Sequence, residues 1–371
     1  MKISWGVLGT CLLVAASGCG SSSSSGVSIA TACADVAKAR CSLGSDCSLA
    51  YQQAGTGFNI LENYGTMATC VQRQTMNCTN ALNAPDNGNT PNQVENQCVP
   101  ALISEQCAAF FDNMTPTACT PTGPRPAGAA CTFNGQCMSG ACNGTKTSVC
   151  GTCGSAPAIG EDCSDSTCAE GDRCLGATET CAAIVGLNGT CDATHPCDRG
   201  YSCVGEDTKT MTAGTCEAAS NSVGTPCGGT MPGCDPTLGL YCGGPAGAKT
   251  CQRVIYPGYN GTVTPDGGAI ASDGGGADSG GAAPTPAGTL CGQLADGMRV
   301  GCVAGGCYTA TGLAGGSDLG GCKPFANDDD ACDTVLGPGC MAPARCVVSG
   351  GGDGGTAGKC TVPVATACPS Q

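Results

Sequence analysis

Cysteine is the one reactive side chain that this sequence contains in large number. The chain of 371 residues has 36 cysteines but a single histidine, His195. Thiols can form disulfides, bind metal ions or act as nucleophiles. With no second histidine and no unpaired nucleophile expected, we predict no catalytic site. We interpret His195, which lies three residues after Asp192, as a histidine in a surface turn.

Cys150 and Cys153 have the spacing of a redox dithiol or of half a zinc site. A redox motif of this kind stands between a strand and a helix, and Gly154-Ser-Ala-Pro157 is a poor helix start. One such pair is also too few for a structural zinc site. We therefore expect Cys150 and Cys153 to be halves of structural disulfides.

Three further patterns resemble functional motifs. Asp328-Asp-Asp330 could supply oxygen ligands to calcium, but no EF-hand loop surrounds it, and we expect a solvated acidic loop. Asp278-Ser-Gly280 resembles an aspartic-protease signature, and the glycines 350, 352 and 355 have dinucleotide-binding spacing. Both lie in low-complexity sequence without flanking apolar strands and helices, so we interpret them as chance matches. We expect no cofactor and no metal.

The N-terminus predicts export and lipid anchoring. Residues 1–18 combine Lys2 with a short apolar run, which is typical of a signal peptide. The run ends in Ala16-Ser-Gly-Cys19, which resembles a bacterial lipobox, and we predict that Cys19 is lipidated. Residues 19–26 then form a serine-rich tether. Cys11 would be removed with the signal peptide and Cys19 would be acylated, which leaves an even number of cysteines that can all pair. Export to an oxidising compartment favours their pairing in disulfides. Gly20 favours the outer membrane if the host has two membranes.

Residues 27–120 hold eight cysteines and most of the helix-compatible sequence. Cys33 and Cys41 are eight residues apart, as are Cys70 and Cys78, so each pair should lie on one helix face. Thr90-Pro-Asn-Gln93 predicts a capped helix start, and we expect Pro100 and Ser104 to interrupt that helix. We predict short helices stapled by about four disulfides. The eight cysteines are Cys33, Cys41, Cys47, Cys70, Cys78, Cys98, Cys107 and Cys119.

After residue 120, six groups of four cysteines form an internal repeat. Four groups occupy residues 121–256: Cys131, Cys137, Cys142, Cys150; Cys163, Cys168, Cys174, Cys181; Cys191, Cys197, Cys203, Cys216; and Cys227, Cys234, Cys242, Cys251. Two occupy residues 288–371: Cys291, Cys302, Cys307, Cys322; and Cys332, Cys340, Cys346, Cys360. Four groups begin with Gly-x-x-Cys. Cys153 and Cys368 are left over, and they could pair with each other.

Residues 257–287 contain no cysteine and little apolar mass, and they predict a disordered linker rich in Gly, Asp, Ala and Ser. The last two modules should then form a separable unit. We expect a small disulfide-rich fold: stapled short helices, then tandem four-cysteine modules with short β-hairpins, turns and little other regular structure. Modules this small cannot rely on a hydrophobic core alone. The formal charge of −14 and the lack of basic stripes disfavour nucleic-acid binding.

The lipobox, the eight-cysteine region with Tyr64-Gly65 before Cys70, and the Gly-x-x-Cys modules resemble myxobacterial-type cysteine-rich surface lipoproteins. The module spacing is also similar to that of the Dickkopf N-terminal cysteine-rich region and of EB modules. The resemblance implies a disulfide-rich surface protein but no particular activity.

From these observations we predict a non-enzymatic, lipid-anchored cell-envelope protein with a structural, adhesion or recognition role. It would contact the membrane through its lipid, and an unidentified protein or glycan at the surface. The alternative is an envelope protein that binds metals through reduced thiols, although Cys-x-Cys is absent from the sequence. A secreted hydrolase is the third possibility. It is disfavoured because the chain has one histidine and no Gly-x-Ser-x-Gly motif.

Overall fold

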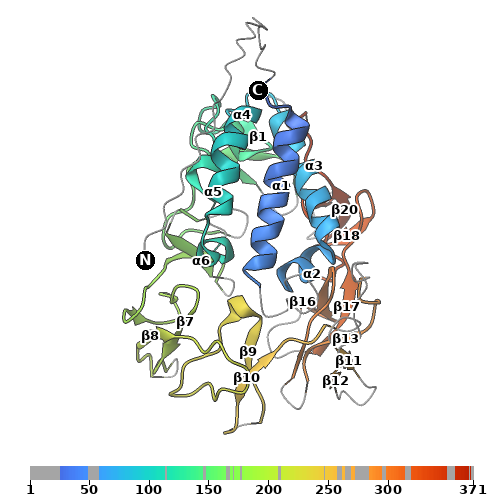
Figure 1. Cartoon of the computed structure of the whole chain (residues 1–371). Coiled ribbons are helices and arrows are strands. Elements are labelled where there is room, and N and C mark those ends of the chain that lie inside the picture. The colour runs from blue at the N-terminus through green and yellow to red at the C-terminus, as the bar shows by residue number, and fades with distance from the viewer. Residues whose placement is uncertain are drawn as a thin grey trace, which may run out of the picture.

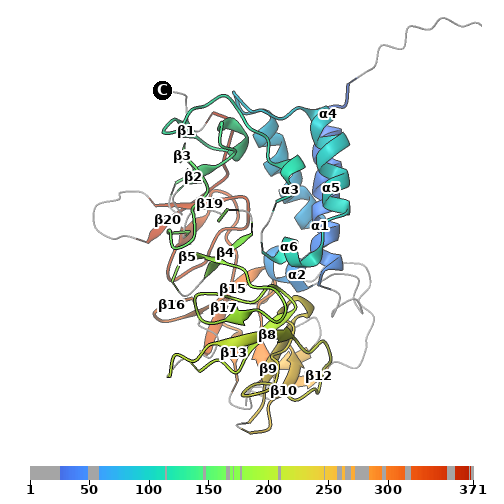
Figure 2. The same cartoon turned by 90° about the vertical axis from the view of Figure 1, so that its left-hand side faces the viewer.

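A computed structural model shows a group of helices packed beside a curved row of small β-modules (Figures 1 and 2). It describes residues 26–48, 58–112, 115–144, 148–163, 168–169, 171–175, 178–207, 210–245, 247–256, 261–263, 269–271, 284–294, 298–313, 319–348, 356–366 and 368. Seventeen disulfides join 34 cysteines of this part of the chain. The predicted fold class, a small disulfide-rich fold with short helices and hairpins, is confirmed.

Helices α1 (Ile29–Asp46) and α3 (Met67–Leu82) are stapled together by two disulfides. Cys33 bonds to Cys78 and Cys41 bonds to Cys70, so the two helices run antiparallel. The spacing of eight residues in each helix places both cysteines on one face, as expected. Side chains of Ser28 and Thr66 cap the two helices by accepting from the backbone N–H three residues on. Helix α2 (Phe58–Tyr64) lies between them in sequence.

The helix that begins at Pro91 continues through Pro100, contrary to expectation. Thr90 and Gln93 form the predicted capping box at the start of α4 (Pro91–Gln93). A π-helical turn, η2 (Val94–Cys98), then leads into α5 (Val99–Ile103), which ends at Ser104. The wider π turn accommodates a proline ring that would clash with an ordinary α-helical turn. Helix α6 (Cys107–Phe111) and the short turn η3 (Thr117–Cys119) follow, and the disulfides Cys47–Cys107 and Cys98–Cys119 fix both.

All six modules share one disulfide pattern, in which the first cysteine bonds to the third and the second to the fourth. Module one has Cys131–Cys142 and Cys137–Cys153, and modules two to six repeat this order. The predicted fourth cysteine of module one, Cys150, was wrong. The spacing to Cys142 left both candidates possible, but Cys153 is the one that lies directly opposite Cys142 in the hairpin.

Each module is an antiparallel hairpin whose two strands carry the third and fourth cysteines directly opposite each other. In four modules a third strand carries the first cysteine. It pairs with the strand of the fourth cysteine, along the edge that the hairpin leaves free. The strands of modules one to three are β1 (Ala130–Cys131), β2 (Cys142–Gly144), β3 (Gly151–Cys153), β4 (Asp172–Leu175), β5 (Thr180–Ala183), β6 (Thr190–Cys191), β7 (Tyr201–Val204) and β8 (Gly214–Ala218). Those of modules four to six are β9 (Leu240–Gly243), β10 (Thr250–Arg253), β13 (Leu290–Gln293), β14 (Arg299–Val300), β15 (Gly305–Thr309), β16 (Gly312–Leu313), β17 (Leu319–Pro324), β18 (Ala331–Asp333), β19 (Arg345–Val348) and β20 (Ala357–Thr361). Short 3₁₀ turns are η4 (Asn134–Gln136) and η5 (Pro236–Leu238).

A turn three residues before the first cysteine is the second feature that all six modules share. The residue there has a positive φ: Gly128, Gly160, Asn188, Gly224, Gly288 and Asp329. The N–H of this positive-φ residue donates to the carbonyl of the module's fourth cysteine. The N–H of the fourth cysteine donates in return to the carbonyl of the residue that follows the positive-φ residue. All of these hydrogen bonds measure 2.8–2.9 Å. The Gly-x-x-Cys seen in four modules is therefore one form of this turn. Asn188 and Asp329 replace glycine because Asn and Asp tolerate the left-handed conformation better than other residues.

Successive modules dock through one repeated β-bridge. The residue four positions after each fourth cysteine bonds to the backbone beside the second cysteine of the next module. Val185, for example, donates to the Pro196 carbonyl and accepts from the N–H of Asp198, at 2.9 and 2.8 Å. Pro157 can only accept, from Ala169. The array is therefore a regular repeat, in which each module bonds through its backbone to the residues that follow the hairpin of the module before it.

A similar bridge, shifted by two residues, joins modules four and five on either side of the predicted linker: Ile255 lies opposite Val300 rather than opposite Cys302. Ile255 donates to the Arg299 carbonyl and accepts from the Gly301 N–H, at 2.9 and 2.8 Å. The segment 257–287 is thus an insertion at a junction where modules four and five contact each other, and this contact argues against the expected separable C-terminal unit. Within the segment, β11 (Gly261–Val263) pairs with β12 (Ala269–Ala271), and Thr285 is buried. Most other positions of the segment lie outside the described residues, and disorder there stays a prediction.

The disulfide Cys150–Cys368 closes the row of modules into a ring. It joins module one to the segment after module six, 218 positions apart in sequence. Figure 1 shows the modules descending from β1, crossing at β9 and β10, and returning through β17 to β20, with the C-terminus beside β1. The pairing of Cys153 with Cys368, which the sequence left possible, does not occur, because Cys153 completes module one and thereby leaves Cys150 to bond with Cys368.

Helices α1 and α5 lie on one side of this ring, opposite to β2, β5 and β20 (Figure 2). A small core of Leu61 from α2, Tyr256, Val303 and Ala304 joins the two parts. The Ala304 N–H also donates to the Leu61 carbonyl at 2.8 Å. A small hydrophobic core therefore stabilises the contact between the helices and modules four and five.

Candidate functional site

Each module gathers its sulfur atoms into one cluster, which makes the modules the first candidate sites. Because the third and fourth cysteines lie opposite each other in the hairpin, their two disulfides lie side by side. Sulfur atoms of three cysteines lie within 4.8 Å of one another in at least five modules, for example Cys163, Cys168 and Cys181. In the oxidised state these sulfurs are bonded in disulfides. If reduced, each cluster would offer thiolates at a separation that suits a zinc or copper ion.

Cys150 and Cys153 belong to different disulfides, to Cys368 and to Cys137 respectively. They are structural half-bridges, as expected, and Cys153 is nearly fully buried. All twenty candidate disulfide cysteines named from Cys33 to Cys216 are paired. The predicted lipidation site Cys19, the Asp278–Gly280 segment and the glycines 350, 352 and 355 lie outside the described residues.

His195 lies in an exposed turn, as predicted. Its Nδ1 is 3.0 Å from Asp192 Oδ1, which also accepts from Thr194 and from the His195 backbone N–H. Hydrogen bonds from Thr194, in the first place, hold the pKa of Asp192 well below its usual range. The side chain of His195 is more than half exposed. Thr194 Oγ1 also lies 3.0 Å from His195 Nδ1, but this hydroxyl donates to Asp192 Oδ1 at 2.7 Å, so the contacts shape an exposed turn.

The acidic loop Asp328–Asp330 is largely occupied by contacts within the chain. Arg73 of α3 makes a bidentate ion pair with Asp328 at 2.6 and 2.8 Å, and it donates to the carbonyls of Met341 and Ala342. Asp329 pairs with Lys359 and adopts the left-handed turn conformation of module six. Asp329 and Asp330 are exposed, in agreement with the expected solvated loop, whereas Asp328 docks module six on the helices.

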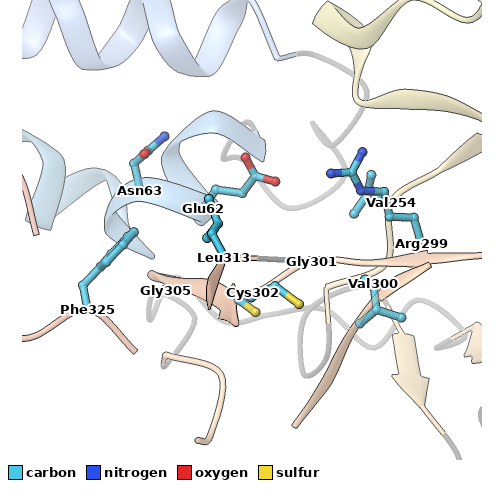
Figure 3. A pocket seen from close by; sticks show the side chains of 12 residues that line it. Glu62, Asn63, Val254, Arg299, Val300, Gly301, Cys302, Gly305, Leu313 and Phe325 are labelled. Carbon is cyan, nitrogen blue, oxygen red and sulfur yellow. The ribbon is translucent and has the colours of Figure 1, made fainter. Parts of the chain in front are cut away.

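A cavity of about 270 Å³ lies where α2 meets module five (Figure 3). Glu62 and Arg299 point toward each other across it, above Leu313, Gly301 and Cys302. Tyr256, which is fully buried, donates to Glu62 Oε1 at 2.6 Å. Burial raises the pKa of Glu62, while the Tyr256 hydrogen bond and the charge of Arg299 oppose that rise. Nothing in the local sequence indicated Glu62, because its surroundings come from residues about two hundred positions away.

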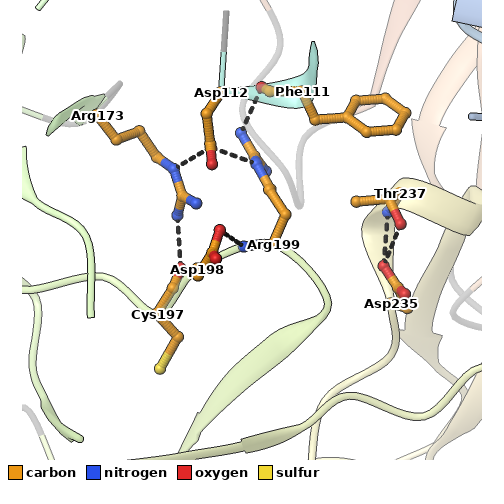
Figure 4. A network of polar contacts seen from close by, with 8 residues as sticks. All are labelled: Phe111, Asp112, Arg173, Cys197, Asp198, Arg199, Asp235 and Thr237. Atoms are coloured by element: carbon orange, nitrogen blue, oxygen red, sulfur yellow. Dashed lines mark hydrogen bonds and ion pairs between the residues drawn. The ribbon is translucent and has the colours of Figure 1, made fainter. Parts of the chain in front are cut away.

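A buried aspartate joins the helices to modules two and three (Figure 4). Asp112 Oδ1 accepts from Arg173 Nε at 2.6 Å and from Arg199 Nε at 3.0 Å. Arg173 also donates to the Cys197 carbonyl, and Arg199 to the Phe111 carbonyl. Asp112 is nearly fully buried, and nothing in its local sequence indicated this role. Charge-assisted bonds of this kind orient the modules rather than perform chemistry.

No family model matches the sequence, and no curated protein or solved structure is significantly similar to it. Among the described helices, none is long and apolar enough to cross a bilayer. The many disulfides indicate an exported or extracellular protein.

Proposed function

We propose that this chain is a non-enzymatic, lipid-anchored protein of the cell envelope with a structural or recognition role. The observation that carries the proposal is the closed array of modules, in which the cysteines of every module are consumed in structural disulfides. Export to an oxidising compartment is consistent with this disulfide content. The Ala16-Ser-Gly-Cys19 sequence supports lipidation at Cys19, and the serines after it would separate the folded part from the membrane.

The loops between the third and fourth cysteines of the modules support the proposed recognition role. The disulfides and the shared turn hold each hairpin, so loops between the third and fourth cysteines can differ in length and composition without loss of the module. We propose that such loops contact a protein or glycan at the cell surface. The outer membrane is the proposed location if the host has two membranes.

The anchor is tested by the mass of the N-terminal peptide of the exported protein. We expect a diacylated cysteine at position 19, and partition of the protein into the detergent phase. Cys19→Ala should move the protein to the aqueous phase or leave it unprocessed. An N-terminal peptide without acyl mass would contradict lipid anchoring, while leaving the disulfide array unaffected.

Metal binding by reduced modules is the second candidate function, because the sulfur atoms of each cluster are already close together. It predicts many reactive thiols and a stoichiometric metal in the protein as isolated. Metal analysis together with thiol titration separates it from the first candidate.

A further inference from the structure

A groove of about 490 Å³ lies between α1 and α5. Figure 2 shows these two helices side by side, on the side of the molecule opposite to β2, β5 and β20. Its apolar part is formed by Leu43 of α1 and by Val99, Leu102 and Ile103 of α5. Ile103, the last residue of α5, is 71 % exposed, whereas its neighbour Leu102 is buried. An exposed isoleucine beside a groove of this size differs from the isolated apolar residues common on protein surfaces.

The groove is also acidic. Asp35 and Asp46 of α1 and Glu95 of η2 line it, against a single cation, Lys38, among the described lining residues. Glu95 Oε2 is shielded from solvent and has no hydrogen-bond partner among the described residues. A shielded carboxylate oxygen without a donor is costly, and a cation bound in the groove beside Glu95 would offset the charge of that carboxylate.

We propose that the α1–α5 groove binds a basic amphipathic peptide segment of a partner protein. Apolar side chains of the segment would contact Leu43, Val99 and Ile103, and its Lys or Arg groups would face Glu95, Asp35 and Asp46. Helices bind in grooves in this way when apolar anchors recur along one face. The inference rests on the proposed recognition role, but not on the lipid anchor.

The test is the binding of a labelled peptide to the full chain, measured by fluorescence anisotropy at about 150 mM salt. The probe is a peptide of about 14 residues with Leu at helical spacing and Lys at the other positions. A counter-probe has Glu in place of every Lys. We expect the basic probe to bind and the acidic one to bind at least about tenfold more weakly.

Two variants remove the proposed contacts, and each has a matched control. Glu95→Gln and Ile103→Asp should each weaken binding of the basic probe by about five- to tenfold. Glu217→Gln and Met211→Asp make comparable chemical changes at exposed positions in module three and should alter binding less than about twofold. Unchanged thermal unfolding would show that all four variants fold.

Three results would overturn the proposal: no binding of the basic probe, equal binding of the acidic probe, or equal losses in the variants and their controls. The last result would mean that the probe responds only to the overall negative charge. None of these results would alter the acyl mass expected on Cys19, so failure of this inference is distinguishable from failure of the anchor.

Discussion

At the scale of single residues, buried charges hold the helices against the ring. Asp112 accepts from two arginines that belong to different modules, Arg173 and Arg199. Arg125, whose side chain is 4 % exposed, pairs with Asp86 and donates to the carbonyls of Ala130 and Cys368. Removing one member of such a set leaves the others buried without a counter-charge.

Asp112→Ala should therefore lower the free energy of unfolding of the oxidised protein by about 3–5 kcal/mol. It leaves two partly buried guanidinium groups without the buried acceptor that they share. Lys359→Ala, which removes an exposed ion pair with Asp329, should cost no more than about 0.5 kcal/mol. Denaturant unfolding under non-reducing conditions measures both. Equal effects of the two substitutions would show that Asp112 does not join the modules.

The raised pKa of Glu62 predicts a pH dependence of stability. Burial makes the folded state bind the Glu62 proton more tightly than the unfolded chain does. The resulting stability is fully present below the ordinary carboxyl pKa and is lost as pH rises through the raised value. Glu62→Gln should thus be at least as stable as the wild type at neutral pH, with the difference shrinking below about pH 4. Thermal midpoints across pH test this, with Glu217→Gln as the exposed control, and a Glu62→Gln protein that is less stable only at neutral pH would contradict it.

At the scale of the element, the turn before each first cysteine depends on backbone conformation. Gly160 has a φ of +82° and no atom within 4 Å of where a Cβ would stand, so a side chain there has space but strains the backbone. Gly160→Val should cost about 1–2 kcal/mol, whereas Gly160→Asn should cost clearly less, since Asn188 occupies the equivalent position in module three. Gly186→Val is the matched control, because Gly186 has equal space and no positive φ. Unfolding midpoints that do not distinguish Gly160→Val from Gly186→Val would contradict this role of the turn.

The sequence predicts the elements whose signals are local. The spacing of Cys33, Cys41, Cys70 and Cys78 indicated two stapled helices, and the Thr90 capping box marked a helix start. Periodic cysteines likewise indicated the modules. The helix through Pro100 was not predictable in the same way, because the π turn that accommodates the proline is set by backbone geometry rather than by residue type.

Contacts between distant parts of the chain were not predictable, because the spacing of cysteines along the sequence does not determine which cysteines lie opposite each other in the fold. Cys150 and Cys153 are equally plausible fourth cysteines in sequence, and only the hairpin register places Cys153 opposite Cys142. The environments of Asp112 and Glu62 likewise come from distant segments. Composition indicated a linker at 257–287 but not that Ile255, just before it, would bond to the backbone of module five.

At the scale of the whole molecule, ring closure predicts the result of a single cut in the insertion. A specific protease site placed within residues 272–280 should give two fragments that remain joined by Cys150–Cys368 under non-reducing conditions. With Cys150→Ser and Cys368→Ser, the fragments should lose the covalent link but still co-elute, because the Arg73–Asp328 ion pair and the packing of Leu61 and Tyr256 against Val303 and Ala304 remain. Non-reducing electrophoresis and size-exclusion chromatography measure the two results. Fragments that separate without reduction in the parent protein would contradict ring closure.

The central claim is that six modules of identical connectivity are closed into a ring by one long-range disulfide. Peptide mapping by mass spectrometry, after alkylation and digestion under non-reducing conditions, tests it most directly. We expect almost no alkylated cysteine, first-to-third and second-to-fourth bridges in every module, and a peptide that links Cys150 to Cys368. Abundant alkylated cysteines with a stoichiometric bound metal, or a bridge from Cys153 to Cys368, would contradict it.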